Sequence, residues 1–131
     1  MLVPLGTATA LMCVMAAKHF CADFLFQTAW IARGKAGTDN WVLPLMLHAG
    51  GHAALTLLIA LLLYPKLWWF APLELVVHAV IDRAKAVVGR RAALDAGQAE
   101  FWWLLGFDQF LHHLTNILIV SGFLALGTPH P

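Results

Sequence analysis

Residues 41–63 read WVLPLMLHAGGHAALTLLIALLL and contain no Asp, Glu, Lys or Arg. A helix needs about 20 mainly apolar residues to cross a bilayer, and this stretch is long enough. Its polar side chains are His48, His52 and Thr56, and the two histidines are four residues apart. The stretch therefore predicts a membrane-spanning helix with two histidines on one face.

The composition of the whole chain agrees with a membrane protein. Of its 131 residues, 61% are hydrophobic and only 11% are charged. This composition excludes a disordered chain and a coiled-coil rod. The net charge is +1, and there is no basic tract of the kind that follows a phosphate backbone, so we expect no nucleic-acid partner.

Turn residues divide the chain into four predicted helices. We expect them at residues 5–32, 41–63, 72–88 and 100–126. There is no linker, repeat or low-complexity segment, so residues 1–131 are predicted to form a single transmembrane domain. The predicted fold class is all-α, an integral membrane four-helix bundle with up-down-up-down topology.

The distribution of Lys and Arg predicts how the bundle is oriented. Six of these residues lie at one side of the predicted membrane, whereas Lys66 is alone in a loop on the other side. The six are Arg33, Lys35, Arg83, Lys85, Arg90 and Arg91. Because positive loops stay in the cytoplasm, both termini are expected on the non-cytoplasmic side. Lys18 lies within the first span, and we expect its side chain to snorkel outward.

Each predicted helix carries one pair of His or Asp side chains four residues apart. Such side chains share a helical face, so each pair can direct two ligand groups to the same place. Random placement of the twelve His and Asp residues gives only about one such pair. The four pairs are His19 and Asp23, His48 and His52, His78 and Asp82, and Asp108 and His112.

The four pairs also lie at matching depths from the predicted cytoplasmic boundary. An up-down bundle would therefore stack them in two layers about 6 Å apart. The layer nearer the cytoplasm would contain Asp23, His48, Asp82 and Asp108. The other layer would contain His19, His52, His78 and His112.

A metal site is the interpretation that best explains eight ionisable groups inside the spans. Each Asp in a bilayer costs roughly 2.5–3.5 kcal/mol, and metal coordination offsets that cost. Imidazoles and carboxylates are ligands of zinc, manganese and iron. Eight ligands exceed one tetrahedral site, so we expect two divalent ions, zinc first, with manganese or iron as alternatives. The simpler alternative is that these side chains hydrogen-bond one another and hold the helices together.

Further polar residues lie on or beside the same helical faces and are expected to orient the ligand side chains. They are Gln27, Glu74, Lys85, Gln109, His113 and Asn116. Alternatives stay open for three of them. Glu74 could simply be interfacial, Lys85 could pair with Asp82 or contact an anionic substrate, and His113 could face lipid.

The residues around these pairs resemble a known family. The similarity rests on HFCADFLFQT at residues 19–28, Leu47 with His48 and His52, HAVIDRAK at residues 78–85, and Asp108, Gln109 and His112. It is a small bacterial inner-membrane family catalogued as a domain of unknown function, and the match covers nearly the whole chain. A looser similarity is to YdjM-type membrane proteins, which are described as predicted metal-dependent hydrolases. The resemblance implies a multi-pass protein of the bacterial inner (cytoplasmic) membrane and a metal-dependent hydrolase, but no particular substrate.

Two classes of function fit these patterns. The first is a hydrolase with two metal ions that acts on a lipid-linked or membrane-proximal ester or phosphoester, with Asp82 or Asp108 as the catalytic base. The chain contains neither a His-Glu-x-x-His nor a Gly-x-Ser-x-Gly motif. The second is a protein that binds or transports divalent metal or protons along the same side chains, for which so small a chain would form a homo-oligomer.

Overall fold

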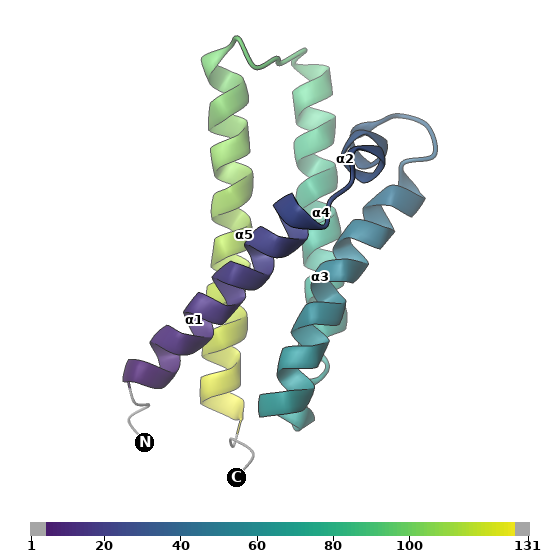
Figure 1. Ribbon diagram of the computed structural model, residues 1–131. Helices are drawn as coiled ribbons and strands as arrows, with labels where there is room; N and C mark the ends of the chain where they lie inside the picture. Colours follow the sequence, from purple (N-terminus) through teal and green to yellow (C-terminus); the bar gives the residue numbers. More distant parts are fainter. Residues whose placement is uncertain (1–4, 128–131) are drawn as a thin grey trace.

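The structure is a computed structural model that describes residues 5–127, and these residues form an all-α protein (Figure 1). The five α-helices are α1 (Leu5–Phe20), α2 (Ala29–Ala36), α3 (Val42–Leu63), α4 (Phe70–Arg91) and α5 (Ala99–Leu126). A π-helical turn, Cys21–Leu25, follows α1, and a short 3-10 helix, Pro65–Leu67, precedes α4.

The long helices form one bundle in which α3 packs along α4, and α4 packs along α5. Helix α1 crosses the bundle obliquely and packs mainly against α5, and the short α2 lies beside α3 and α4. The first and last described residues lie at the same end of the molecule, whereas α2 and the α4–α5 connection lie at the other end (Figure 1).

Three segments are long and apolar enough to cross a membrane, as expected for a multi-pass protein. They are Leu5–Leu25, Val42–Leu63 and Ala99–Leu126. Helix α4 is also long, with 22 residues, but it carries acidic and basic side chains that lower its hydropathy. Large apolar side chains such as Leu62 and Leu118 are exposed on the outside of the bundle, as contact with lipid requires.

The prediction of one continuous helix over residues 5–32 was wrong. Helix α1 ends at Phe20, and the amide of Phe26 donates to the carbonyl of Cys21 at 2.9 Å in the π-helical pattern. Thr28 then begins α2, because its extended backbone lets its hydroxyl accept from the amide of Ile31 at 3.3 Å. The chain therefore changes direction at residues 26–28, after the π-helical turn that carries Asp23.

Helix α4 extends beyond the predicted range 72–88 at both ends. It continues through Gly89 to Arg91, and the left-handed residue that follows it is Ala93, with φ of 50°. Gly89 adopts no positive φ, so it does not end the helix. The additional turn places Arg90 beside α2, where its guanidinium donates to the carbonyl of Gly37.

The half of the bundle that holds the first and last described residues has a tightly packed apolar core, which we call the apolar end. Phe70 meets Phe123 edge to face, with ring centroids 5.3 Å apart, and Tyr64 stacks on Phe123 at 5.3 Å. Gly122 is required there, because a Cβ atom would collide with the ring of Phe70. The buried core residues are Leu11, Met15, Ala60, Tyr64, Leu67, Phe70, Ile119, Val120 and Phe123.

Candidate metal centre

The opposite half of the bundle, which we call the polar end, contains the four His and Asp pairs. All eight side chains are buried, with exposed fractions from 0% for His52 to 9% for Asp23. They come from α1 and its π-helical turn, α3, α4 and α5. Residues spaced along the whole sequence are thus brought to one place inside the bundle.

Four histidines, one from each of these segments, form a ring across the interior. The ring centroids of neighbouring histidines are 5.4 Å apart for His19 and His52, and 3.9 Å apart for His52 and His78. They are 4.1 Å apart for His78 and His112, and 5.3 Å apart for His112 and His19. The histidines of this ring are the four that the sequence predicted in the layer farther from the cytoplasm.

Asp23 lies at the centre of one group of imidazoles. Its Oδ1 atom is 2.9 Å from His52 Nε2 and 3.1 Å from His48 Nε2. Its Oδ2 atom is 3.2 Å from His19 Nε2. The π-helical turn that carries Asp23 thus directs its carboxylate toward both α3 and α1. Short π-helical turns are frequent at functional sites.

Asp82 joins the imidazoles to a lysine from α2. Its Oδ2 atom accepts from Lys35 Nζ at 2.6 Å and lies 3.4 Å from His48 Nε2. Its Oδ1 atom lies 3.3 Å from His112 Nε2. One oxygen of the Asp82 carboxylate therefore faces His112, and the other lies between His48 and Lys35.

Asp108 has a similar arrangement on α5. Its Oδ2 atom accepts from Lys85 Nζ at 2.8 Å and from Gln109 Nε2 at 3.2 Å. Its Oδ1 atom lies 3.5 Å from His112 Nε2 but has no hydrogen-bond partner among the described residues. Lys85 thus pairs with Asp108, rather than with Asp82 on its own helix.

The side chains define two groups that could hold metal ions, within each of which the ligand atoms lie within 4.8 Å of one another. The first is Asp23, His48, His52 and His78, and the second is His78, Asp82 and His112. His78 belongs to both groups, so the two sites adjoin. His19 and Asp108, which the sequence also predicted as ligands, border these groups instead of belonging to them.

An unpartnered buried atom supports a cation in this position. The Nε2 atom of His78 is buried and has no hydrogen-bond partner among residues 5–127, and it lies among the carboxylate oxygens of Asp23 and Asp82 and the neighbouring imidazoles. A buried polar atom without a partner costs about 1–3 kcal/mol. A divalent cation among these nitrogen and oxygen atoms would satisfy it, and imidazole with carboxylate is a common donor set for such ions.

Several of the predicted orienting residues contact the cluster. The side chain of Gln109 donates to Asp23 Oδ2 at 3.4 Å, and its Oε1 atom lies 3.2 Å from His19 Nε2. Gln27 donates to the backbone carbonyl of Asp23 at 2.9 Å, which fixes the end of the π-helical turn. The His113 ring is exposed, yet its centroid lies 5.3 Å from that of His19.

Lys18 and Glu74 form a buried ion pair on the side of the histidine ring that faces the apolar end. The prediction that Lys18 snorkels outward was wrong, because Lys18 is 6% exposed and Glu74 is 3% exposed. The ammonium contacts Glu74 Oε1 and donates to Thr56 Oγ1 at 3.0 Å. Glu74 therefore contacts a lysine instead of an imidazole. The amide nitrogen of Asn116, which is also buried, has no partner among the described residues.

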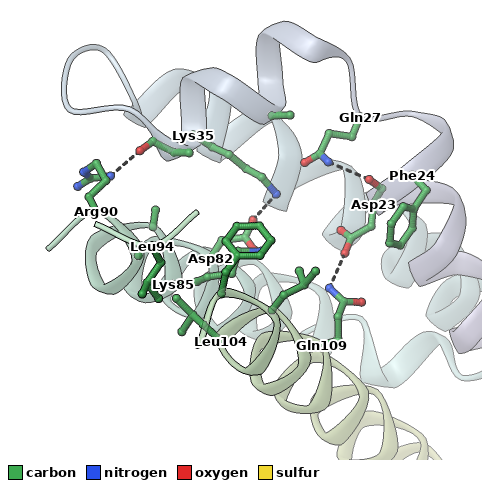
Figure 2. Close-up of a pocket in the computed structure, with 16 residues that line it drawn as sticks. Asp23, Phe24, Gln27, Lys35, Asp82, Lys85, Arg90, Leu94, Leu104 and Gln109 are labelled. Carbon is green, nitrogen blue, oxygen red and sulfur yellow. Dashed lines mark hydrogen bonds and ion pairs between the residues drawn. The ribbon is translucent and has the colours of Figure 1, made fainter. Parts of the chain in front are cut away.

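A cavity of about 380 Å³ opens beside the carboxylates at the polar end (Figure 2). Asp23 and Asp82 lie in its wall, together with Lys35, Lys85 and Arg90. The sequence did not predict a role for Lys35 at the site, because this residue appeared only as one of the cytoplasmic positive charges. Thr28 could have indicated the start of a new helix, because threonine is a favoured N-cap residue, and that helix places Lys35 beside the bundle.

Fold and site together define a helical protein with several candidate membrane spans and a buried His and Asp cluster that could bind metal. The chain belongs to the family DUF3307, described as a protein of unknown function, whose profile matches residues 11–130. Neither the curated proteins nor the solved structures include a match to the chain.

Proposed function

We propose that this protein is a membrane-embedded hydrolase that depends on two divalent metal ions held at the polar end. The observation that carries the proposal is the position of the carboxylates, which lie between a ring of imidazoles and an open cavity. A merely structural cluster would need no cavity beside its charged groups. Asp23 and Asp82 contact the imidazoles and also line the cavity, so a substrate could reach them there.

The two ligand groups would each hold one ion. Asp23, His48 and His52 would hold the first, and Asp82 and His112 the second. His78 has two ring nitrogens and belongs to both groups, so it can contribute to either site. Zinc is the expected metal, with manganese or iron as alternatives. A pair of such ions supplies Lewis acidity and makes hydroxide available near neutral pH.

We propose Asp108, in preference to Asp82, as the general base. Both oxygens of Asp82 lie within 3.4 Å of a nitrogen of Lys35, His48 or His112. Asp108 Oδ1, in contrast, has no hydrogen-bond partner among the described residues and is free to accept a proton. Lys85 and Gln109 hold the other oxygen of Asp108 and so fix the direction of the free one.

We further propose that the polar end faces the cytoplasm of a bacterial cell across its inner membrane. The six basic residues that the sequence placed on one side all belong to this end, on α2 or the last turns of α4. Helix α4 would then be a fourth span, with its buried polar residues packed toward α3 and α5, in an up-down-up-down bundle with both termini outside.

Transport of a metal or of protons is the second candidate. The Lys18, Glu74 and Thr56 contacts favour it, because they continue the polar interior past the histidine ring. Beyond this ion pair, however, the nine buried residues of the apolar end close the interior with aromatic and aliphatic side chains. An enzyme needs only one opening, so the hydrolase is the better supported of the two functions.

The test is a hydrolysis assay on the protein purified in nanodiscs, with soluble esters and phosphoesters as substrates and with zinc or manganese added. We expect turnover that a chelator abolishes. Asp108→Asn should lower the rate by about 100-fold or more, because general-base catalysis typically contributes that much, and should retain metal. Asp95→Asn, in the exposed α4–α5 connection, is the matched control and should keep the full rate. Chelator-resistant turnover, or an unaffected Asp108→Asn variant, would refute the proposal.

A further inference from the structure

A second hollow lies on the outside of the bundle between α4 and α5. It is a groove of about 240 Å³ that faces the lipid region. Lys85 and Leu104 line both this groove and the cavity at the polar end, so the two hollows adjoin at these side chains. Asp108 lines the groove, whereas Asp23 and Asp82 line the cavity. A bound molecule could therefore occupy both hollows and pass directly beside the carboxylates.

The cavity wall carries three basic side chains, Lys35, Lys85 and Arg90, against the two carboxylates of Asp23 and Asp82. Lys35 and Lys85 each use one contact on a carboxylate, and an ammonium group has two further hydrogens to donate. Arg90 Nη1 donates to the backbone carbonyls of Ala36 and Gly37, which leaves Nε and Nη2 of the guanidinium for other acceptors. Figure 2 shows Lys35 and Lys85 beside Asp82, and Arg90 at the edge of the same hollow with its guanidinium on a backbone carbonyl. Groups of this kind bind phosphate through charge-assisted hydrogen bonds.

The groove has the character of a site for a hydrocarbon chain. Apart from Lys85 and Asp108, its lining is entirely apolar, and Val80 and Phe107 are 61% and 58% exposed on the lipid-facing surface. The apolar lining consists of Val80, Ile81, Ala84, Val88, Leu104, Phe107 and Leu111.

We infer that the substrate is a phosphate-bearing amphiphile of the cytoplasmic monolayer, with its phosphate among Lys35, Lys85 and Arg90 and its chain in the α4–α5 groove. This inference rests on the proposed hydrolase and names its substrate class. In the reaction, water forms a new P–O bond and the P–O bond to the lipid alcohol breaks. Asp108 accepts a proton from the water and returns it to the leaving oxygen. For a phosphate monoester, the products are the free alcohol and inorganic phosphate.

Binding can be measured separately from hydrolysis with phosphonates, which resist cleavage. We would titrate hexadecyl phosphonate, butyl phosphonate and inorganic phosphate against the protein in phosphatidylcholine nanodiscs. The long-chain ligand should bind at least about tenfold more tightly than the butyl ligand, since its chain fills the groove. Equal affinities for the two phosphonates would overturn the part of the inference that concerns the groove.

Two variants with matched controls test the two hollows. Ala84→Trp fills the groove and should remove the preference for the long chain, while butyl phosphonate binding persists. Val76→Trp, on the lipid-facing surface of α4 outside the groove, should leave the preference intact. Arg90→Gln should weaken both phosphonates by about tenfold, as expected for loss of a charge-assisted contact, whereas Arg91→Gln should not. Unchanged binding in Ala84→Trp and Arg90→Gln would overturn the inference.

The same experiment separates this inference from the proposed hydrolase. If phosphonates bind as expected but hexadecyl phosphate is not hydrolysed with metal present, the binding site stands and the hydrolase fails. If the protein hydrolyses soluble esters but binds no phosphonate, the hydrolase stands and the substrate class is wrong. Retained metal content and an unchanged elution volume in each variant show that the variants are folded.

Discussion

The two halves of the bundle are built from the same helices but are stabilised by different interactions. At the apolar end, α1, α3, α4 and α5 meet through aromatic and aliphatic side chains around Phe123. At the polar end, the same helices meet through imidazoles and carboxylates. The apolar end holds the helices together and closes the interior, whereas the polar end carries the groups that could bind metal. Each half can therefore be altered with a distinct consequence.

The largest effect should come from His78→Ala at the polar end. His78 belongs to both ligand groups, so its removal takes a donor from each. We expect loss of both metal ions and of all metal-dependent activity, measured by elemental analysis of the purified variant. His113→Ala is the matched control, because His113 is exposed and belongs to neither group. If His78→Ala binds as much metal as the unaltered protein, the assignment of the two groups is wrong.

An intermediate effect is expected at the border between the halves, from Glu74→Gln. This change leaves the ammonium of Lys18 buried without its anionic partner. Breaking a buried pair on one side costs about 3–5 kcal/mol, and this should appear as lower resistance to denaturant in detergent. The double variant Lys18→Met and Glu74→Leu removes both charges and should recover most of that loss. A double variant less stable than Glu74→Gln would show that the pair itself stabilises the bundle.

The smallest effect on the site should come from the apolar end. Phe123→Ala removes a fully buried ring that contacts Tyr64 and Phe70. We expect a loss of about 3 kcal/mol in the free energy of unfolding, typical of a cavity in a packed core. The metal content of the folded variant should be unchanged. Loss of metal from folded Phe123→Ala would show that the two halves are not separable.

Much of the site could be predicted from the sequence, because polar side chains inside a membrane helix avoid lipid and turn toward the bundle interior. The spacing of four residues in each helix, together with the matching depths, placed His52 and His78 in the same predicted layer. The predicted layers were also informative: His19, His52, His78 and His112 do form one ring.

Features that depend on contacts between helices could not be predicted in the same way. At residues 26–28 the sequence offers only the polar pair Gln27 and Thr28, which does not by itself end a predicted helix, so the break that returns Lys35 to Asp82 was missed. Lys18 and Glu74 are 56 residues apart, and only the packing of α1 against its neighbours brings them together. Similarly, the pairing of Lys85 with Asp108 depends on how α4 and α5 face each other.

The most direct test of the central claim is the metal content of the unaltered protein. The protein would be purified in detergent, washed with a chelator, reloaded with zinc or manganese, and freed of excess metal by gel filtration. The two adjoining ligand groups predict two retained ions per chain, measured by elemental analysis against protein concentration. No retained metal under any of these conditions would contradict the account and would leave the His and Asp cluster as a hydrogen-bonded link between helices.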